Sequence, residues 1–242
     1  MKQLALDIAA PPAPTLDNFV PGRNAELVVA LYAAANGANH ERFIYLWGAP
    51  GSGRSHLLRA ALEAARQHGR RTAWFDSRAV AFDAADDAFA AADDVHRLGA
   101  EAQIALFDLH NRVRAGTGTL IASGNAAPAQ LALRADLATR LAAGLVYQVH
   151  GLNDDEKAAA LGRHANARGV RLAPEVADYL LRHTQRDLPS LLALLDALDR
   201  HSLATKRAIT LPLLRELLSL TPDPTPGGRG EPNTSFSVRE KD

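Results

Sequence analysis

The sequence predicts an α/β fold, with a parallel sheet and helices on both faces, followed by a small all-helical subdomain. Short apolar runs alternate with helical segments over roughly residues 42–150, and only helical patterns follow them. A glycine-rich loop joins the first strand-like run to a helix. Parallel strands need crossover connections, so this alternation of strands and helices indicates a parallel sheet.

Five apolar runs predict the strands of the sheet. The first, RFIYLW at residues 42–47, is rich in aromatic and β-branched residues and ends at the glycine-rich loop, which is typical of a buried strand. The other four runs are residues 72–75, 88–92, 119–122 and 145–149.

Two longer helices are predicted between these strands. Residues 53–68 follow the loop directly. Residues 100–114 carry apolar side chains at helical spacing, namely Ile104, Phe107, Leu109 and Val113. The segment 76–87 is near the minimum length of a crossover, so we expect only a short helix there.

Residues 152–220 predict the helical subdomain. Asn153 or Asp154 can cap its first helix, and the acidic residues of the first turn suit the helix dipole. Three further helices are expected at residues 174–185, 188–202 and 211–220, the second with a leucine stripe at helical spacing.

The two ends of the chain differ from its body. Ala-Ala-Pro-Pro-Ala-Pro at 9–14 predicts an extended spacer behind a short N-terminal peptide, because proline fixes φ. Residues 221–242 contain four Pro and three Gly and few large apolar groups, so we expect disorder. The expected parts are therefore residues 1–14, 15–151, 152–220 and 221–242.

Composition narrows the function classes. The chain has no cysteine, which excludes a disulfide scaffold, cysteine-ligated zinc and thiol catalysis. Its 27 Lys+Arg balance 27 Asp+Glu, which argues against a protein that grips nucleic acid with its whole surface. No apolar run approaches the roughly 18 residues of a membrane span, and the N-terminus is a poor signal peptide. We therefore expect a cytoplasmic protein.

The glycine-rich loop carries the strongest chemical signal. Gly48-Ala-Pro-Gly-Ser-Gly-Arg-Ser55 matches the phosphate-binding pattern G-x-x-x-x-G-K-[ST] except that Arg54 replaces lysine. A strand precedes it and a helix follows, so backbone N–H groups and the helix N-terminus can hold phosphate oxygens. The nucleotide-binding residues expected here are Gly48, Pro50, Gly51, Ser52, Gly53, Arg54, Ser55 and His56.

Arginine in place of lysine changes the expected activity. Its planar fork has a different reach from the compact lysine ammonium, so we expect nucleotide binding to survive better than catalysis. Ser55 and the acidic pair Asp93-Asp94 at the end of the third strand are predicted magnesium ligands. Ser123-Gly124-Asn125 ends the fourth strand, where it can contact a γ-phosphate or form a plain turn.

These motifs resemble the DnaA-related AAA+ family, and most closely its Hda-type regulatory inactivators. The resemblance runs from about Leu4 to Leu220. Four segments carry it: Asp17–Asn24, Tyr45–Leu58 with its Arg54, Phe107–Arg112 and Asp136–Leu141. It implies an AAA+ P-loop parallel sheet with a helical lid, and a bound ADP or ATP with Mg²⁺.

The resemblance also assigns residues. It implies that Val20 and Gly22 contact the nucleotide and that Arg140 is an arginine finger acting in trans. Asn125 stands where the initiator has an acid in its first sensor. Pro189 stands where the family's lid has a nucleotide-sensing arginine, and Arg186 is either its substitute or a solvated charge.

The N-terminal residues resemble a sliding-clamp-binding peptide. Gln3, Leu4, Leu6 and Ile8 match the Q-L-x-L-x-[LI] pattern, in which an extended peptide places apolar side chains in a groove. An ordinary strand or a frayed tail is the alternative interpretation of so short a match.

The resemblance implies a negative regulator of replication initiation. Such a protein is tethered to the DNA polymerase III sliding clamp and stimulates hydrolysis of ATP bound by DnaA. The expected partners are DnaA and the clamp, with DNA reached only through the clamp and no membrane, and a homodimer stays open. We expect no autonomous ATPase activity. The alternatives are a stand-alone AAA+ ATPase and a helicase-loader or initiator-like replication protein.

Overall fold

The computed structural model describes residues 13–38, 40–184 and 187–220. In it, the predicted strands form one parallel sheet in the order β2-β3-β4-β1-β5. The strand bounds are β1 Phe43–Trp47, β2 Thr72–Phe75, β3 Phe89–Ala92, β4 Thr119–Gly124 and β5 Leu145–Gln148. Every strand lies where the apolar runs predicted it, within two residues at its ends.

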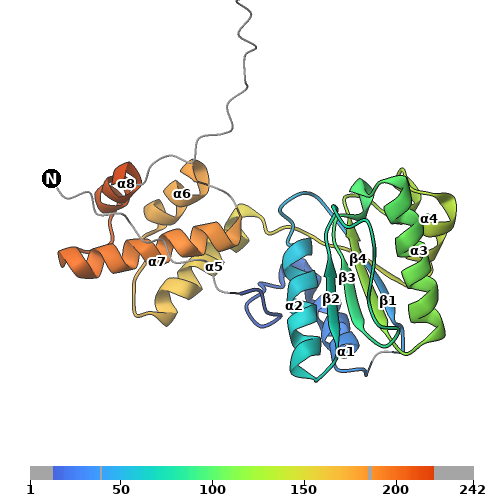
Figure 1. Cartoon of the computed structure of the whole chain (residues 1–242). Coiled ribbons are helices and arrows are strands. Elements are labelled where there is room, and N and C mark those ends of the chain that lie inside the picture. The colour runs from blue at the N-terminus through green and yellow to red at the C-terminus, as the bar shows by residue number, and fades with distance from the viewer. Residues whose placement is uncertain (1–12, 39, 185–186, 221–242) are drawn as a thin grey trace, which may run out of the picture.

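Helices cover both faces of the sheet (Figure 1). Helices α1, Ala25–Ala35, and α2, Arg54–Gln67, cover one face, and α3, Ala100–Ala115, and α4, Ala135–Ala142, cover the other. Three short 3₁₀ helices, at Gly22–Asn24, Val95–Arg97 and Pro128–Gln130, lie in the connections.

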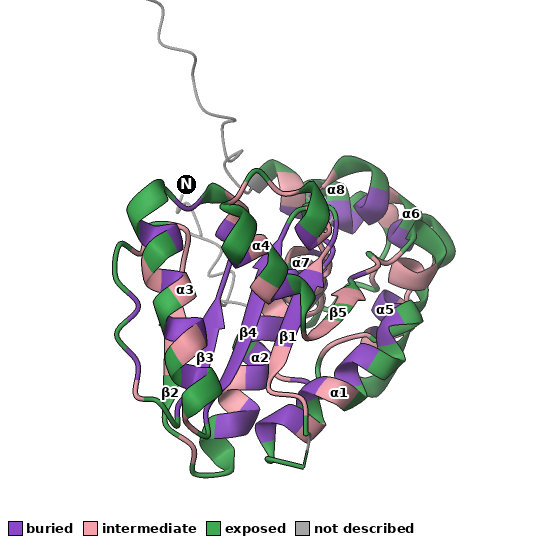
Figure 2. Cartoon of the chain, turned by 90° about the vertical axis from the view of Figure 1, so that its right-hand side faces the viewer, coloured by how far each residue is buried: buried purple, intermediate pink, exposed green. Residues whose placement is uncertain are grey.

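Side chains of the central strands alternate between these two layers. Ile44 and Leu46 of β1 pack in the cluster under α1 and α2, whereas Tyr45 packs in the cluster under α3 and α4. Strands β1, β3 and β4 are largely buried in the middle of the molecule (Figure 2). Burial on both faces explains why these strands read as continuous apolar runs.

The segment 76–87 forms no helix, which corrects the expected short one. Arg112 of α3 donates hydrogen bonds to the carbonyl oxygens of Phe82 at 2.8 Å and Ala84 at 2.9 Å. The Phe82 ring is buried and lies 4.8 Å from that of Phe75. Side-chain donors from α3 thus replace intrahelical hydrogen bonds in holding this segment.

The predicted apolar face of residues 100–114 is partly wrong. Ile104 is 44% exposed, while Leu106, Leu109 and Val113 are completely buried. With the buried Ala102, these residues form a stripe at four- and three-residue spacing that excludes Ile104. Alanine contributes little to an apolar pattern, so the buried face that includes Ala102 was not recognised from the sequence.

The helical subdomain has a core of its own. Its helices are α5 Asp154–Ala167, α6 Pro174–His183, α7 Leu188–Thr205 and α8 Leu211–Leu220. Buried leucines from all four, among them Leu161, Leu180, Leu195 and Leu214, form one cluster. This cluster is separate from the two clusters that flank the sheet.

Capping residues fix the starts of two helices of the helical subdomain, α5 and α7. Asn153 accepts a hydrogen bond from the Glu156 amide at 2.7 Å, and the Glu156 carboxylate accepts one from the Asn153 amide at 2.8 Å. Of the two predicted caps, Asn153 is therefore the one used. Asp187 caps α7 in the same way through the Ser190 amide, with Pro189 in the first turn. Among the helices in the described part of the chain, none is both long and apolar enough to cross a membrane.

Candidate functional site

The glycine-rich loop lies at the carboxyl edge of the sheet, between β1 and α2. Gly53 has φ +102°, and a Cβ there would lie 2.9 Å from the Phe19 ring. A Cβ on Gly48 would collide with the carbonyl oxygen of Val149, which follows β5. Glycine is thus required at one position for its backbone conformation and at both for close packing.

The loop contains polar groups that no protein atom satisfies. Ser52 is 7% exposed, and its Oγ has no hydrogen-bond partner among the described residues. The first N–H groups of the 14-residue helix α2 lack intrahelical partners, as at any helix start. A buried hydroxyl beside a helix N-terminus fits an anionic oxygen ligand, and a phosphate group suits this loop.

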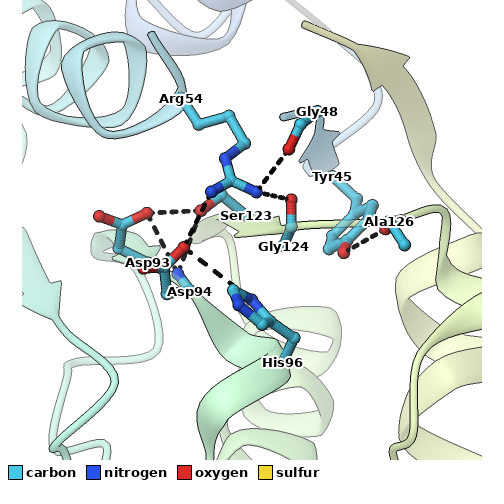
Figure 3. A network of polar contacts seen from close by, with 9 residues as sticks. All are labelled: Tyr45, Gly48, Arg54, Asp93, Asp94, His96, Ser123, Gly124 and Ala126. Atoms are coloured by element: carbon cyan, nitrogen blue, oxygen red, sulfur yellow. Dashed lines mark hydrogen bonds and ion pairs between the residues drawn. The ribbon is translucent and has the colours of Figure 1, made fainter. Parts of the chain in front are cut away.

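Arg54 is the first residue of α2, and its side chain points into the protein (Figure 3). Its side chain is 9% exposed. One guanidinium nitrogen, Nη1, donates to the Gly48 carbonyl at 2.9 Å and to that of Gly124. The other, Nη2, lies 3.2 Å from Oδ1 of Asp94. The guanidinium therefore ties the loop to the ends of β3 and β4.

The acidic pair follows β3 and is also engaged by protein groups. The Ser123 hydroxyl donates to Oδ1 of Asp93 at 2.5 Å, and the Asp94 amide donates to the same oxygen at 3.1 Å. Asp94 has φ +51° and ψ +45°, a left-handed conformation that is uncommon for residues other than glycine but that aspartate adopts more readily than most. His96 Nδ1 lies 3.9 Å from Asp94, and burial lowers the pKa of this imidazole.

These contacts test the predicted magnesium ligands. Magnesium needs nearly octahedral oxygen coordination at about 2.0–2.1 Å, with carboxylate oxygens free to reach it. Here Asp94 is paired with a cation, and Oδ1 of Asp93 accepts two protein donors. In this arrangement Oδ1 of Asp93 and Oδ1 of Asp94 already have protein partners, so the predicted donor set, completed by Ser55, offers a divalent cation a poor fit.

The segment before α1 packs against the loop. The Phe19 ring lies 5.5 Å from the His56 ring, and His56 Nε2 lies 3.2 Å from the Thr15 carbonyl oxygen. Burial lowers the pKa of His56. The predicted ligand His56 is thus held by this segment, and the predicted ligand Val20, which belongs to the segment, is half-buried.

Gly22 connects the same segment to the lid. It has φ +49°, and a Cβ there would lie 3.0 Å from Leu152 and 3.3 Å from Glu156, at the start of α5. The sequence-predicted residues Val20, Gly22 and the loop thus lie together, next to where the lid begins.

Asn24, which is 3% exposed, belongs to the site although no sequence pattern indicated it. Its Nδ2 donates to the carbonyl oxygens of Pro21 at 3.0 Å and His150 at 2.8 Å, and its Oδ1 accepts from the His150 amide at 2.8 Å. This one side chain fastens the N-terminal segment to the connection between β5 and the lid. A polar residue before an apolar helix is usually interpreted as a helix cap, so the sequence around Asn24 gave no sign of this longer-range role.

Tyr45 is a part of the site that was not predicted, and it lies against Gly124 of the predicted Ser123-Gly124-Asn125 turn. The Tyr45 hydroxyl donates to the Ala126 carbonyl at 2.9 Å, and burial raises the pKa of this phenol. The Tyr45 hydroxyl lies where a Cβ on Gly124 would stand, so glycine at this position leaves room for the tyrosine side chain. The predicted ligand Asn125 is exposed just beyond this point.

Arg140 lies apart from the loop, in the last turn of α4. Its guanidinium carbon is 5.7 Å from the centroid of the Phe107 ring. Arg140 also lines a small cavity with His110 and Phe43, the first residue of β1. The predicted peptide residues Gln3, Leu4, Leu6 and Ile8, and the lid residue Arg186, lie outside the described residues.

Residues 154–218 match the family model described as the Hda lid domain. The helical subdomain is therefore similar to an Hda lid domain. The matched residues include all or nearly all of each of the four helices α5 to α8.

Solved structures resemble the whole described chain. Domain III of the replication initiation protein DnaA from Thermotoga maritima is 18% identical, with a TM-score of 0.66, over 87% of this chain and 98% of that one. AMPPCP-bound DnaA from Aquifex aeolicus is 21% identical, with a TM-score of 0.65, over 81% and 71%. RuvB from Thermotoga maritima is 15% identical, with a TM-score of 0.63, over 86% and 72%.

These likenesses establish the fold. The predicted AAA+ sheet with a helical lid is confirmed. Together with the Hda lid, the DnaA-like fold also confirms the predicted resemblance to Hda-type, DnaA-related proteins.

Proposed function

We propose that this chain is a replication regulator that acts on DnaA and promotes hydrolysis of the ATP that DnaA binds. The observation that carries the proposal is an Hda lid domain at residues 154–218, attached to an α/β domain with the fold of DnaA. Pairing of this chain with DnaA is inferred by analogy from the shared fold and the lid match.

The chain's own loop binds a nucleotide in this proposal. The glycine-rich turn, the unpartnered Ser52 hydroxyl and the start of α2 support a phosphate ligand. A DnaA of similar fold binds AMPPCP. By family resemblance the resident nucleotide is ADP, with ATP as the alternative. Its part is to hold the α/β domain and the lid in one arrangement.

Arg140 acts on the nucleotide of the partner. It lines a small cavity with residues 43–45 of β1, whereas the chain's own loop follows Trp47 at the end of that strand. Two to four residues of strand span about 7–13 Å, so Arg140 lies some way along the strand from its own loop. A cation–π contact with the Phe107 ring holds the guanidinium of Arg140, which is partly exposed. An arginine supplied in trans stabilises transition-state charge and raises hydrolysis by about 10³- to 10⁵-fold in other nucleotidases.

The N-terminal peptide supplies the location. Gln3, Leu4, Leu6 and Ile8 bind the sliding clamp, and the proline-rich spacer at 9–14 gives the tether reach. Tethering raises the effective concentration of the chain near DNA-bound DnaA without any new contact.

The test is hydrolysis of DnaA-bound ATP with this chain added, with and without sliding clamp loaded on DNA. We expect stimulation that requires the loaded clamp and is lost when Gln3 and Leu4 are both changed to Ala. Arg140→Ala should abolish stimulation while clamp binding remains. Arg140→Lys should stay defective, since lysine lacks the planar fork.

Arg114→Ala is the matched control. Arg114 is an exposed arginine in the last turn of the neighbouring α3, and its loss should leave stimulation intact. Full stimulation by folded Arg140→Ala protein would remove the finger from the mechanism. Turnover of ATP by the chain alone, abolished by Asp94→Ala, would favour the stand-alone ATPase. A steeply salt-dependent affinity for duplex DNA would favour the loader or initiator alternative.

A further inference from the structure

The arginine in the phosphate loop is bonded to the protein itself. Phosphate loops of this type use a lysine at this position to reach the β- and γ-phosphates. Here the Arg54 guanidinium meets three acceptors from three segments: Gly48 of the loop, Gly124 of β4 and Asp94 after β3 (Figure 3). These acceptors surround a nearly buried group, so the guanidinium is committed to internal contacts.

The shape of arginine explains this arrangement. Its planar fork presents several donors in fixed directions and can bridge acceptors on separate segments, which a compact ammonium group does less well. A buried cation also needs a nearby anion, and Asp94 at 3.2 Å supplies it. Asp94 therefore serves as the counter-ion of the nearly buried Arg54 guanidinium.

Asp93, the other acid of the pair, also has hydrogen-bond partners within the protein. Oδ1 of Asp93 accepts from the Ser123 hydroxyl and from the Asp94 amide. Ser123 is completely buried, and its position in β4 places the hydroxyl beside Asp93. Both carboxylates at this edge of the sheet thus have protein partners in the place where phosphate-loop hydrolases hold magnesium.

We propose that the loop binds its nucleotide without a divalent cation, with the Arg54–Asp94 pair occupying the place of the metal. This inference rests on the nucleotide binding put forward under Proposed function. The phosphates are held by backbone N–H groups of the loop, by Ser52 and by the start of α2. A divalent cation has to displace Arg54 from Asp94 and is repelled by the guanidinium, so it adds little to nucleotide affinity.

The experiment is equilibrium binding of ADP to the full chain, by calorimetry, in Mg²⁺ and in EDTA. We expect dissociation constants that agree within about twofold, which is under about 0.5 kcal/mol. Mn²⁺ added to the ADP complex should give no protein-bound signal in electron paramagnetic resonance. Binding that weakens about tenfold or more in EDTA would overturn the inference alone. Absence of ADP binding in both conditions would overturn it together with the nucleotide-binding part of the proposed function.

Two variants separate the Arg54–Asp94 pair from a metal site. Arg54→Lys withdraws the fork from Asp94, so a magnesium dependence of about tenfold should appear. Asp94→Asn keeps the shape of the side chain and frees Arg54, so ADP affinity should change by the same factor in Mg²⁺ and in EDTA. A loss confined to Mg²⁺ would mean that Asp94 is a metal ligand, which contradicts the inference. Asp108→Asn, an exposed acid on α3, is the control and should leave both affinities unchanged.

Discussion

Changing Asn24 to alanine is expected to lower the free energy of unfolding by about 2–3 kcal/mol, because three buried hydrogen bonds contribute about 1 kcal/mol each. The bonds to Pro21 and His150 are 2.8–3.0 Å long, and the Asn24 side chain is nearly inaccessible to water. Urea unfolding followed by far-ultraviolet circular dichroism measures the loss. Asn166→Ala, at an exposed position of α5, should change stability by no more than about 0.5 kcal/mol.

Asn24→Asp tests the donor geometry itself. Aspartate keeps an acceptor for the His150 amide but loses both donors, and its charge faces the carbonyl oxygens of Pro21 and His150. We expect it to cost about 1–2 kcal/mol more than alanine at pH 7. An unsupported buried carboxylate has a raised pKa in the folded state, so this extra loss should shrink as pH falls. An aspartate variant as stable as the parent at pH 7, or an alanine variant that loses under about 0.5 kcal/mol, would refute the assigned bonds.

Three further changes follow from the same structure. Burial lowers the pKa of His110 to about 4, with Arg140 and Arg114 adding to the effect. The unfolded chain therefore binds more protons as pH falls below about 6.5, and stability should drop by about 2 kcal/mol between pH 7 and pH 5. His110→Phe should remove that share of the pH dependence in urea unfolding. Ser123→Ala strips a donor from buried Asp93 and should cost about 1–3 kcal/mol, measured by thermal unfolding; an unchanged melting temperature would contradict the bond. Gly53→Ala places a side chain at a position with positive φ and in contact with Phe19, so it should lower the free energy of unfolding by about 1–3 kcal/mol and weaken ADP binding. Unaltered stability would show that the loop relaxes freely.

Several features could be predicted because their causes lie within a few residues of the chain. The run at 42–47, the turn at Gly48–Ser55 and the helix after it follow from apolar content and from glycine at strained positions. The cap at Asn153 follows from the acidic residue three positions later. Local physics of this kind was enough to predict a glycine-rich turn between a strand and a helix, a parallel sheet and a helical subdomain.

The errors and omissions arise from contacts between distant segments. Segment 76–87 has no helix because Arg112, about 30 residues away, supplies its hydrogen-bond donors. Helices α1 and α4 were not predicted, since alanine is neutral in a periodicity analysis and the buried faces of these helices are defined by the sheet.

Patterns along the chain are enough to nominate the candidate residues, whereas the contacts of each residue follow from the folded structure. Arg54 is a departure from a motif when read along the chain; pairing with Asp94, 40 residues on, makes it an internal counter-ion. Asn24 acquires its role from His150, 126 residues away. Strand order brings these groups together, and it depends on burial over both faces of the sheet, a sum over the whole chain that no local pattern contains.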